Sequence, residues 1–138
     1  MRITRDAMDD VDAHAAEGYP NEICGILIAQ PGSDVVTVAR RVRNTVVERA
    51  RDRYDMDPVD QIRIQRECDE RGLEIVGYYH THPDHPARAS ATDSARSWAG
   101  PVYVIVSCVG GRTADARAWV ADQDGGAMRE VPFEVVDG

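Results

Sequence analysis

Short apolar runs of strand length, separated by segments with helical spacing, constrain the fold of this sequence most. Residues 23–29 and 74–79 are such runs, and Pro, Asn and Gly bound the first of them. Residues 5–17 carry apolar side chains at helical spacing, and residues 57–72 begin with Asp-Pro, a typical helix start. This alternation predicts an α+β fold, an α/β sandwich in which helices flank a mixed central β-sheet.

The rest of the chain continues the same pattern. We expect one or two further strands in residues 35–47, a short helix over residues 92–99, and strands over residues 102–106, 114–120 and 128–136. No internal repeat or linker divides the 138 residues, and this length suffices to bury one core. The sequence therefore predicts one domain over residues 1–138.

The charge balance argues against nucleic acid as a partner. The formal net charge is −8, so the field of the protein repels phosphate backbones unless a basic patch forms locally. Arginines gather in residues 40–53, but Glu48 and Asp52 interrupt them, which is typical of a solvated surface. All 16 basic residues are arginine, and no apolar run approaches the ~20 residues of a membrane span. We expect neither a nucleic acid nor a membrane as partner.

Cysteine usage indicates a reducing compartment. Cys24, Cys68 and Cys108 are odd in number and form no C-x-x-C pair, which disfavours a disulfide framework or a thiolate metal site. The first residues are polar and acidic, where a signal peptide would be apolar. We expect buried thiols in a cytoplasmic protein.

Two histidines at the end of a predicted strand indicate metal chemistry. One residue separates His80 from His82, and because strand side chains alternate between faces, both imidazoles point the same way. Neutral imidazole is a preferred zinc ligand, and a catalytic zinc site adds a third protein ligand. Asp93 suits this role, since it follows a loop long enough to fold back and begins a helix, where the backbone dipole favours a carboxylate.

Each part of this pattern also has a simpler interpretation. Two histidines before a proline can form a surface turn, and Ser90-x-x-Asp93 matches a helix capping box. Three of the four histidines, however, lie within six residues, directly after a strand and before this serine and aspartate. Together these features favour a metal site.

The same residues resemble the JAMM signature of MPN-domain metalloproteases, H-x-H-x(7)-S-x(2)-D, through His80, His82, Ser90 and Asp93. That family also places an essential glutamate upstream on an early strand, and the segment around Glu22 is similar to it. The chain resembles the minimal, stand-alone prokaryotic type of the family. The resemblance implies an MPN-like architecture related to that of cytidine deaminases.

The resemblance further implies one zinc ion per chain, held by His80, His82 and Asp93. It implies that Glu22 is the general base and acid and that Ser90 supports the oxyanion. These roles agree with physical chemistry, because zinc lowers the pKa of bound water to about 7 and a nearby carboxylate can pass the proton to the leaving amine.

The implied activity is that of a zinc-dependent peptidase or isopeptidase. It would hydrolyse the amide bond after the C-terminal Gly-Gly of a small ubiquitin-like or sulfur-carrier protein. We expect the extended glycine tail to add as a strand to a sheet edge beside the zinc.

Two alternatives stay open. Residues 80–85 also match H-x-H-x-D-H, the signature of dinuclear metallo-β-lactamase-type hydrolases, although no histidine follows His85 to complete that site. The other is a noncatalytic MPN-like interaction scaffold, although such a module has no evident need for all five site residues. The sequence assigns no role to His14 or His85 and does not indicate an oligomeric state.

Overall fold

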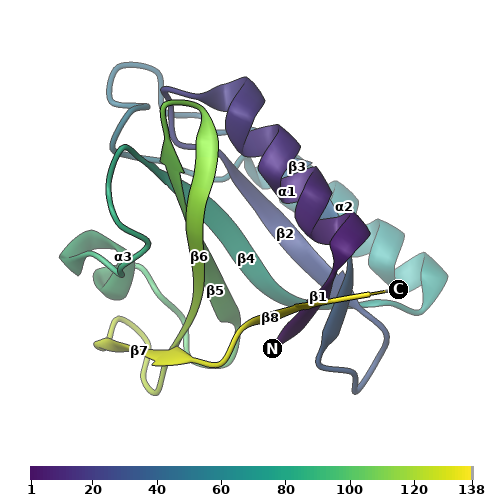
Figure 1. The fold of residues 1–138 in the computed structure, drawn as a ribbon. Coiled ribbons are helices and arrows are strands. Elements are labelled where there is room, and N and C mark those ends of the chain that lie inside the picture. The colour runs from purple at the N-terminus through teal and green to yellow at the C-terminus, as the bar shows by residue number, and fades with distance from the viewer. Residues whose placement is uncertain (138) are drawn as a thin grey trace.

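A mixed β-sheet of eight strands organises the protein, of which the computed structural model describes residues 1–137. The strand order is β7-β6-β5-β4-β2-β3-β1-β8, so β4 lies in the interior of the sheet (Figure 1). The strands are β1 (Arg2–Thr4), β2 (Cys24–Ala29), β3 (Val35–Val42), β4 (Glu74–Pro83), β5 (Val102–Val109), β6 (Arg112–Ala121), β7 (Met128–Val131) and β8 (Glu134–Val136).

Two helices cover opposite faces of this sheet (Figure 1). Helix α1 (Arg5–Gly18) packs Val11 against a cluster that includes Leu27 of β2, whereas α2 (Pro58–Arg71) packs Ile64 against a cluster that includes Ile26 of β2. Neighbouring residues of β2 enter different clusters because strand side chains alternate between faces. The predicted sandwich of helices around a mixed sheet is thus confirmed.

The predicted ends of the second helix are also confirmed. The Asp57 side chain accepts a hydrogen bond from the Val59 amide at 3.0 Å, and Pro58 occupies the first helical turn. Gly72 ends the helix at a φ of 66°, in the left-handed region that glycine adopts without strain. The chain then enters β4 at once, so the length of α2 fixes where this strand starts.

Strand β4 is longer than predicted, and the corrected strand includes both histidines. The sequence places its end at residue 79, but the strand runs to Pro83 and pairs in parallel with β5 as far as Cys108. Pairing with β2 stops at His80, because β2 begins at Cys24. The Thr81 amide still donates to the Ile23 carbonyl at 3.1 Å, and after it β4 pairs with β5 only, which is where a proline is tolerated in a strand.

The C-terminal segment is a second correction. The single strand predicted over residues 128–136 is interrupted at Pro132 and forms β7 at one edge of the sheet and β8 at the other. Figure 1 shows this yellow segment passing from β7 to β8. Strand β8 pairs in parallel with β1, and the sequence did not predict β1. Because only two residues join the two edges, the sheet must curve strongly.

Smaller differences concern the loops beside the histidines. Helix α3 (Ala91–Ala95) is shorter than the predicted residues 92–99. Residues 35–47 supply one full strand, β3, followed by an isolated bridge between Asn44 and Met56 that closes the loop between them. None of the helices described is long and apolar enough to cross a membrane. The single domain over residues 1–138 stays a prediction.

Candidate metal centre and active site

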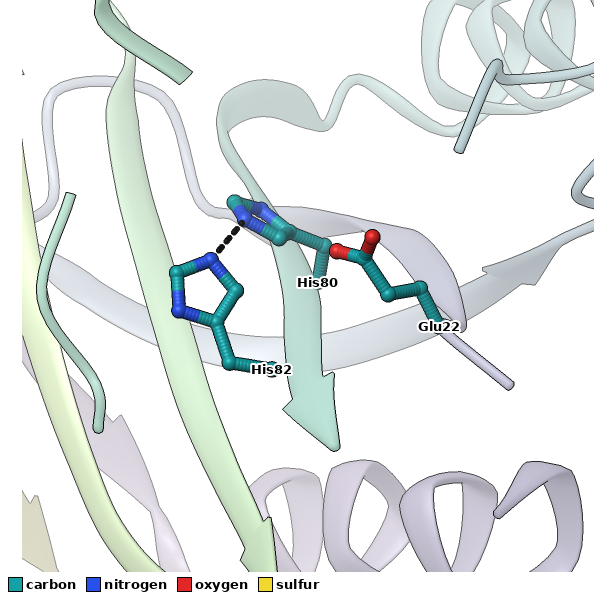
Figure 2. Close-up of side chains that lie close together, drawn as sticks. All are labelled: Glu22, His80 and His82. Carbon is teal, nitrogen blue, oxygen red and sulfur yellow. Dashed lines mark hydrogen bonds between the residues drawn. The ribbon is translucent and has the colours of Figure 1, made fainter. Parts of the chain in front are cut away.

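The two histidines of β4 converge on one point. His80 and His82 share a strand face, and their Nε2 atoms lie 3.3 Å apart (Figure 2). Tyr79, which directly precedes His80, faces the α1 side of the sheet instead, where it belongs to the hydrophobic core. His80 is almost fully buried, with 2% of its side chain exposed, and burial lowers the pKa of its imidazole.

Asp93 joins the histidines from the first turn of α3. Its Oδ1 lies 3.1 Å from Nε2 of His80 and its Oδ2 lies 3.0 Å from Nε2 of His82. Burial alone would raise the pKa of this carboxyl, but hydrogen bonds with both imidazoles outweigh burial, so the pKa lies far below its usual range. The carboxylate is therefore charged at neutral pH.

The capping box that the sequence suggested for α3 is present. Ser90 Oγ accepts from the Asp93 amide at 3.0 Å, and the Ser90 amide donates to Asp93 Oδ2 at 2.9 Å. The capping interpretation and the metal-site interpretation are therefore compatible, because the cap orients the carboxylate that the histidines contact.

Backbone and aromatic contacts hold the imidazoles in place. Nδ1 of His82 donates to the carbonyl of Pro86 at 2.9 Å, which leaves Nε2 as the nitrogen available to a metal. Burial lowers the pKa of His82, but hydrogen bonding to Asp93 outweighs it and the pKa is raised. The ring of Tyr54 stacks on His80, with centroids 4.6 Å apart and planes 25° apart.

Glu22 lies two residues before the start of β2, and its side chain reaches the same point. One of its carboxylate oxygens lies within 4.8 Å of a ring nitrogen of both His80 and His82, so these three side chains form a group that could hold a metal ion. Figure 2 shows the carboxylate directed toward the imidazoles. Glu22 is 6% exposed, and burial raises the pKa of its carboxyl to about 7. The four charged or imidazole side chains expected at the site are thus brought together.

A cleft of about 580 Å³ opens over these residues. Its floor includes Glu22, His82 and Asp93, and its walls come from two loops, residues 51–54 and 83–90. Ser90 and His85 line the second wall. A cleft with convergent polar groups and a carboxyl of perturbed pKa is the typical form of an enzyme site.

Asn44 anchors the first wall, and no motif in the sequence pointed to this residue. Its Nδ2 donates to the carbonyl oxygens of Glu22 at 3.0 Å and of Arg53 at 3.1 Å. Its Oδ1 accepts from the amides of Val46 at 3.0 Å and Asp55 at 3.1 Å. The Asn44 side chain thereby joins both ends of the 45–55 loop to Glu22.

The dinuclear alternative fails at Asp84. In that interpretation Asp84 would be a metal ligand, but its carboxylate accepts hydrogen bonds from the Tyr19 hydroxyl at 2.6 Å and the Gly110 amide at 3.0 Å.

His14 also lies outside the site, since its Nδ1 contacts the Tyr79 hydroxyl at 2.8 Å on the α1 side of the sheet.

Fold and site together define a metal-dependent hydrolase of the JAMM type. The sequence model of prokaryotic homologs of the JAB domain matches residues 4–122. The chain therefore belongs to the family of prokaryotic JAB-domain proteins, and the resemblance found in the sequence is confirmed.

Individual relatives agree with this assignment. A desampylase from Haloferax volcanii is 37% identical over 128 residues, which make up 89% of this chain and 90% of that protein. A CysO-cysteine peptidase from Mycobacterium tuberculosis is 30% identical over 137 residues, 98% of this chain and 90% of that protein. A solution structure of a protein from Desulfitobacterium hafniense superposes with a TM-score of 0.83 at 25% identity, covering 99% of this chain and 93% of that one.

Proposed function

We propose that this protein is a zinc-dependent peptidase in which His80, His82 and Asp93 hold one zinc ion. Three ligands at about 2.0–2.1 Å from a tetrahedral zinc ion stand about 3.3 Å from one another. The two imidazole nitrogens are 3.3 Å apart, and each lies 3.0–3.1 Å from an oxygen of Asp93. This close set of two nitrogens and a charged carboxylate, open to a cleft, is the observation that carries the proposal.

Zinc bound by these residues would polarise the scissile carbonyl and lower the pKa of a water molecule to about 7. Glu22 would accept a proton from the attacking water and deliver it to the leaving nitrogen, a task for which a pKa of about 7 is suited. Ser90 Oγ accepts from the Asp93 amide through a lone pair, so its own hydrogen can donate to the developing oxyanion.

The proposed substrate is a small ubiquitin-like or sulfur-carrier protein, cut after its C-terminal Gly-Gly. Two relatives that nearly span this chain, a desampylase and a CysO-cysteine peptidase, support it. The addition of the tail as a strand beside the zinc stays a prediction; its support is that β4 loses its pairing with β2 at His80, so the last residues of β4 pair with β5 only. The tail would reach this edge through the cleft lined by residues 51–54 and 83–90.

Replacing the proposed base tests this function. Glu22→Gln should bind zinc as the wild type does but lose about 10²–10⁴-fold in kcat on a carrier protein extended beyond Gly-Gly, since an amide cannot exchange the proton. Glu70→Gln, an exposed substitution of the same kind on α2, should leave kcat as in the wild type. Full activity of Glu22→Gln would remove Glu22 from the mechanism.

The scaffold alternative predicts a different result. A noncatalytic module would bind the carrier protein without cleaving it, with or without zinc.

The cytoplasmic location stays a prediction; its support is that Cys24, Cys68 and Cys108 are all buried and free.

A further inference from the structure

Unpaired arginines are concentrated at the cleft. Most of the 16 arginines have a carboxylate within 4.0 Å, as expected in a chain with 24 acidic residues. Those with no such partner among residues 1–137 are Arg51, Arg53, Arg66, Arg88 and Arg112. Three of these five, Arg51, Arg53 and Arg88, line the cleft over the proposed metal site.

These arginines stand on both walls. Arg53 belongs to the loop that Asn44 anchors, and it is near enough to Glu22 to lower the pKa of that carboxyl slightly against the effect of burial. Arg88 comes from the other lining segment, two residues before Ser90. Arg51 lies farther out, where its charge acts on Tyr19 and Asp84. Arg53 and Arg88 therefore come from two different segments that line the same cleft as Glu22, His82 and Asp93.

No acidic side chain of the cleft forms an ion pair with these arginines. Asp93 contacts the two histidines, Asp52 pairs with Arg49 at 2.9 Å, and Glu22 has the role of proton carrier. An anionic substrate group would be repelled by Glu22 and by the net charge of −8 unless cations were placed to receive it. Two guanidinium groups that line the cleft meet that need, since arginine binds carboxylates through paired hydrogen bonds.

The proposed substrate restricts where this anion can be. A Gly-Gly tail has no charged side chain, so the anion nearest the scissile bond belongs to its leaving side. When a single amino acid follows Gly-Gly, its α-carboxylate is two bonds from the leaving nitrogen and necessarily enters the cleft. An isopeptide bond to a lysine side chain would place uncharged methylene groups there instead.

We propose that Arg53 and Arg88 bind the α-carboxylate of an amino acid attached after Gly-Gly, so that the enzyme prefers such free-acid termini to isopeptides. This inference rests on the proposed peptidase function. Arg51 adds positive charge at the entrance, and the two inner arginines determine the specificity for the leaving group.

The test compares two substrates that differ in one charge. A ubiquitin-like sulfur-carrier protein ending in Gly-Gly-Ala is prepared as the free acid and as the C-terminal carboxamide, and the zinc-loaded full-length enzyme is assayed on both. We expect the wild type to cleave the acid at least about tenfold more efficiently, by kcat/KM, than the amide. Arg53→Gln and Arg88→Gln should each bring this ratio toward one.

Matched controls separate a local effect from a general one. Arg66→Gln and Arg112→Gln remove the same charge from exposed, unpaired arginines outside the cleft and should keep the wild-type ratio. Equal cleavage of acid and amide by the wild type would overturn the inference and leave the peptidase function intact. An equal loss on both substrates in the cleft variants would also overturn it, because the arginines would then bind acidic side chains of the carrier. Cleavage of neither substrate by the wild type would count against the peptidase function itself.

Discussion

His80 is the least exposed of the proposed ligands, and its orientation depends on residues outside the JAMM signature. Tyr54 stacks on the imidazole of His80. Arg96 in turn contacts Tyr54 twice: the Arg96 side chain donates to the Tyr54 carbonyl at 2.7 Å, and the Arg96 guanidinium lies 5.6 Å from the centroid of the Tyr54 ring. Arg96 also pairs with Asp55. A chain of contacts from α3 to the loop before α2 therefore sets the position of one ligand.

Tyr54 should act through its ring rather than its hydroxyl. Tyr54→Phe should keep the zinc affinity, whereas Tyr54→Leu should weaken it by about 3–10-fold, the value of an aromatic contact. Competition with a chromogenic zinc chelator measures both. An equal loss in the two variants would instead point to the hydroxyl, and no loss in Tyr54→Leu would show that the stack does not position His80.

His14 gives a pH-dependent contribution to stability. Burial between α1 and the sheet lowers the pKa of His14 from its ordinary 6.5 to about 4, so the unfolded chain binds the proton more tightly than the folded chain. Its effect therefore disfavours the folded state progressively as the pH falls from about 6.5 to 4. After a discount for its partial exposure, we expect a loss of about 1–2 kcal/mol over this range.

The comparison with His14→Gln separates the contribution of His14 to the unfolding free energy from those of the other acid-sensitive groups. The wild type should lose unfolding free energy relative to His14→Gln as the pH falls, when both are followed by urea unfolding at several pH values. Parallel curves for the two proteins would exclude His14 as the source.

At the scale of elements, the 45–55 loop is fixed to the site mainly by Asn44. Asn44→Asp keeps the oxygen that accepts from Val46 and Asp55 but removes the donor to Glu22 and Arg53. We expect this variant to lower kcat/KM by about tenfold while zinc stoichiometry stays the same, because Glu22 and Arg53 lose their common anchor. Loss of zinc together with activity would mean that Asn44 serves the metal site or general folding instead.

The sequence was informative about elements whose signals are local. The helix start at Asp57-Pro58, the stop at Gly72 and the capping box at Ser90 and Asp93 all depend on residues within a few positions of one another, and all three are present. The end of β4 was misjudged because its extension to Pro83 depends on β5, whose paired residues lie 25 positions further along the chain, as in Pro83 and Cys108. Glu22 had no local signal either, and only the family resemblance singled it out.

At the scale of the whole molecule, the sheet could be predicted as a class but not as a topology. Strand β1 is only three residues long and gains its place by pairing in parallel with β3 and β8. The split at Pro132 sends β7 and β8 to opposite edges, which no apolar pattern within residues 128–136 records. Strand order, and with it the interior position of β4, depends on such long-range pairing.

Gly77 tests how tightly β4 and β5 must approach for the site to form. A Cβ at this position would overlap the backbone carbonyl of Val102, which cannot turn aside as a side chain could. Gly77→Ala should therefore lower the free energy of unfolding by about 1–3 kcal/mol, as measured by urea unfolding. An unchanged unfolding free energy would mean that the two strands can separate without cost at this end.

The most direct test of the central claim is the zinc content of the purified protein after zinc exposure and desalting. We predict one zinc per chain in the wild type and in Glu22→Gln, and none in His82→Gln, whose side chain is partly exposed and can be replaced with the fold intact. A wild type without zinc, or a His82→Gln variant that keeps a full equivalent, would contradict the proposed metal site.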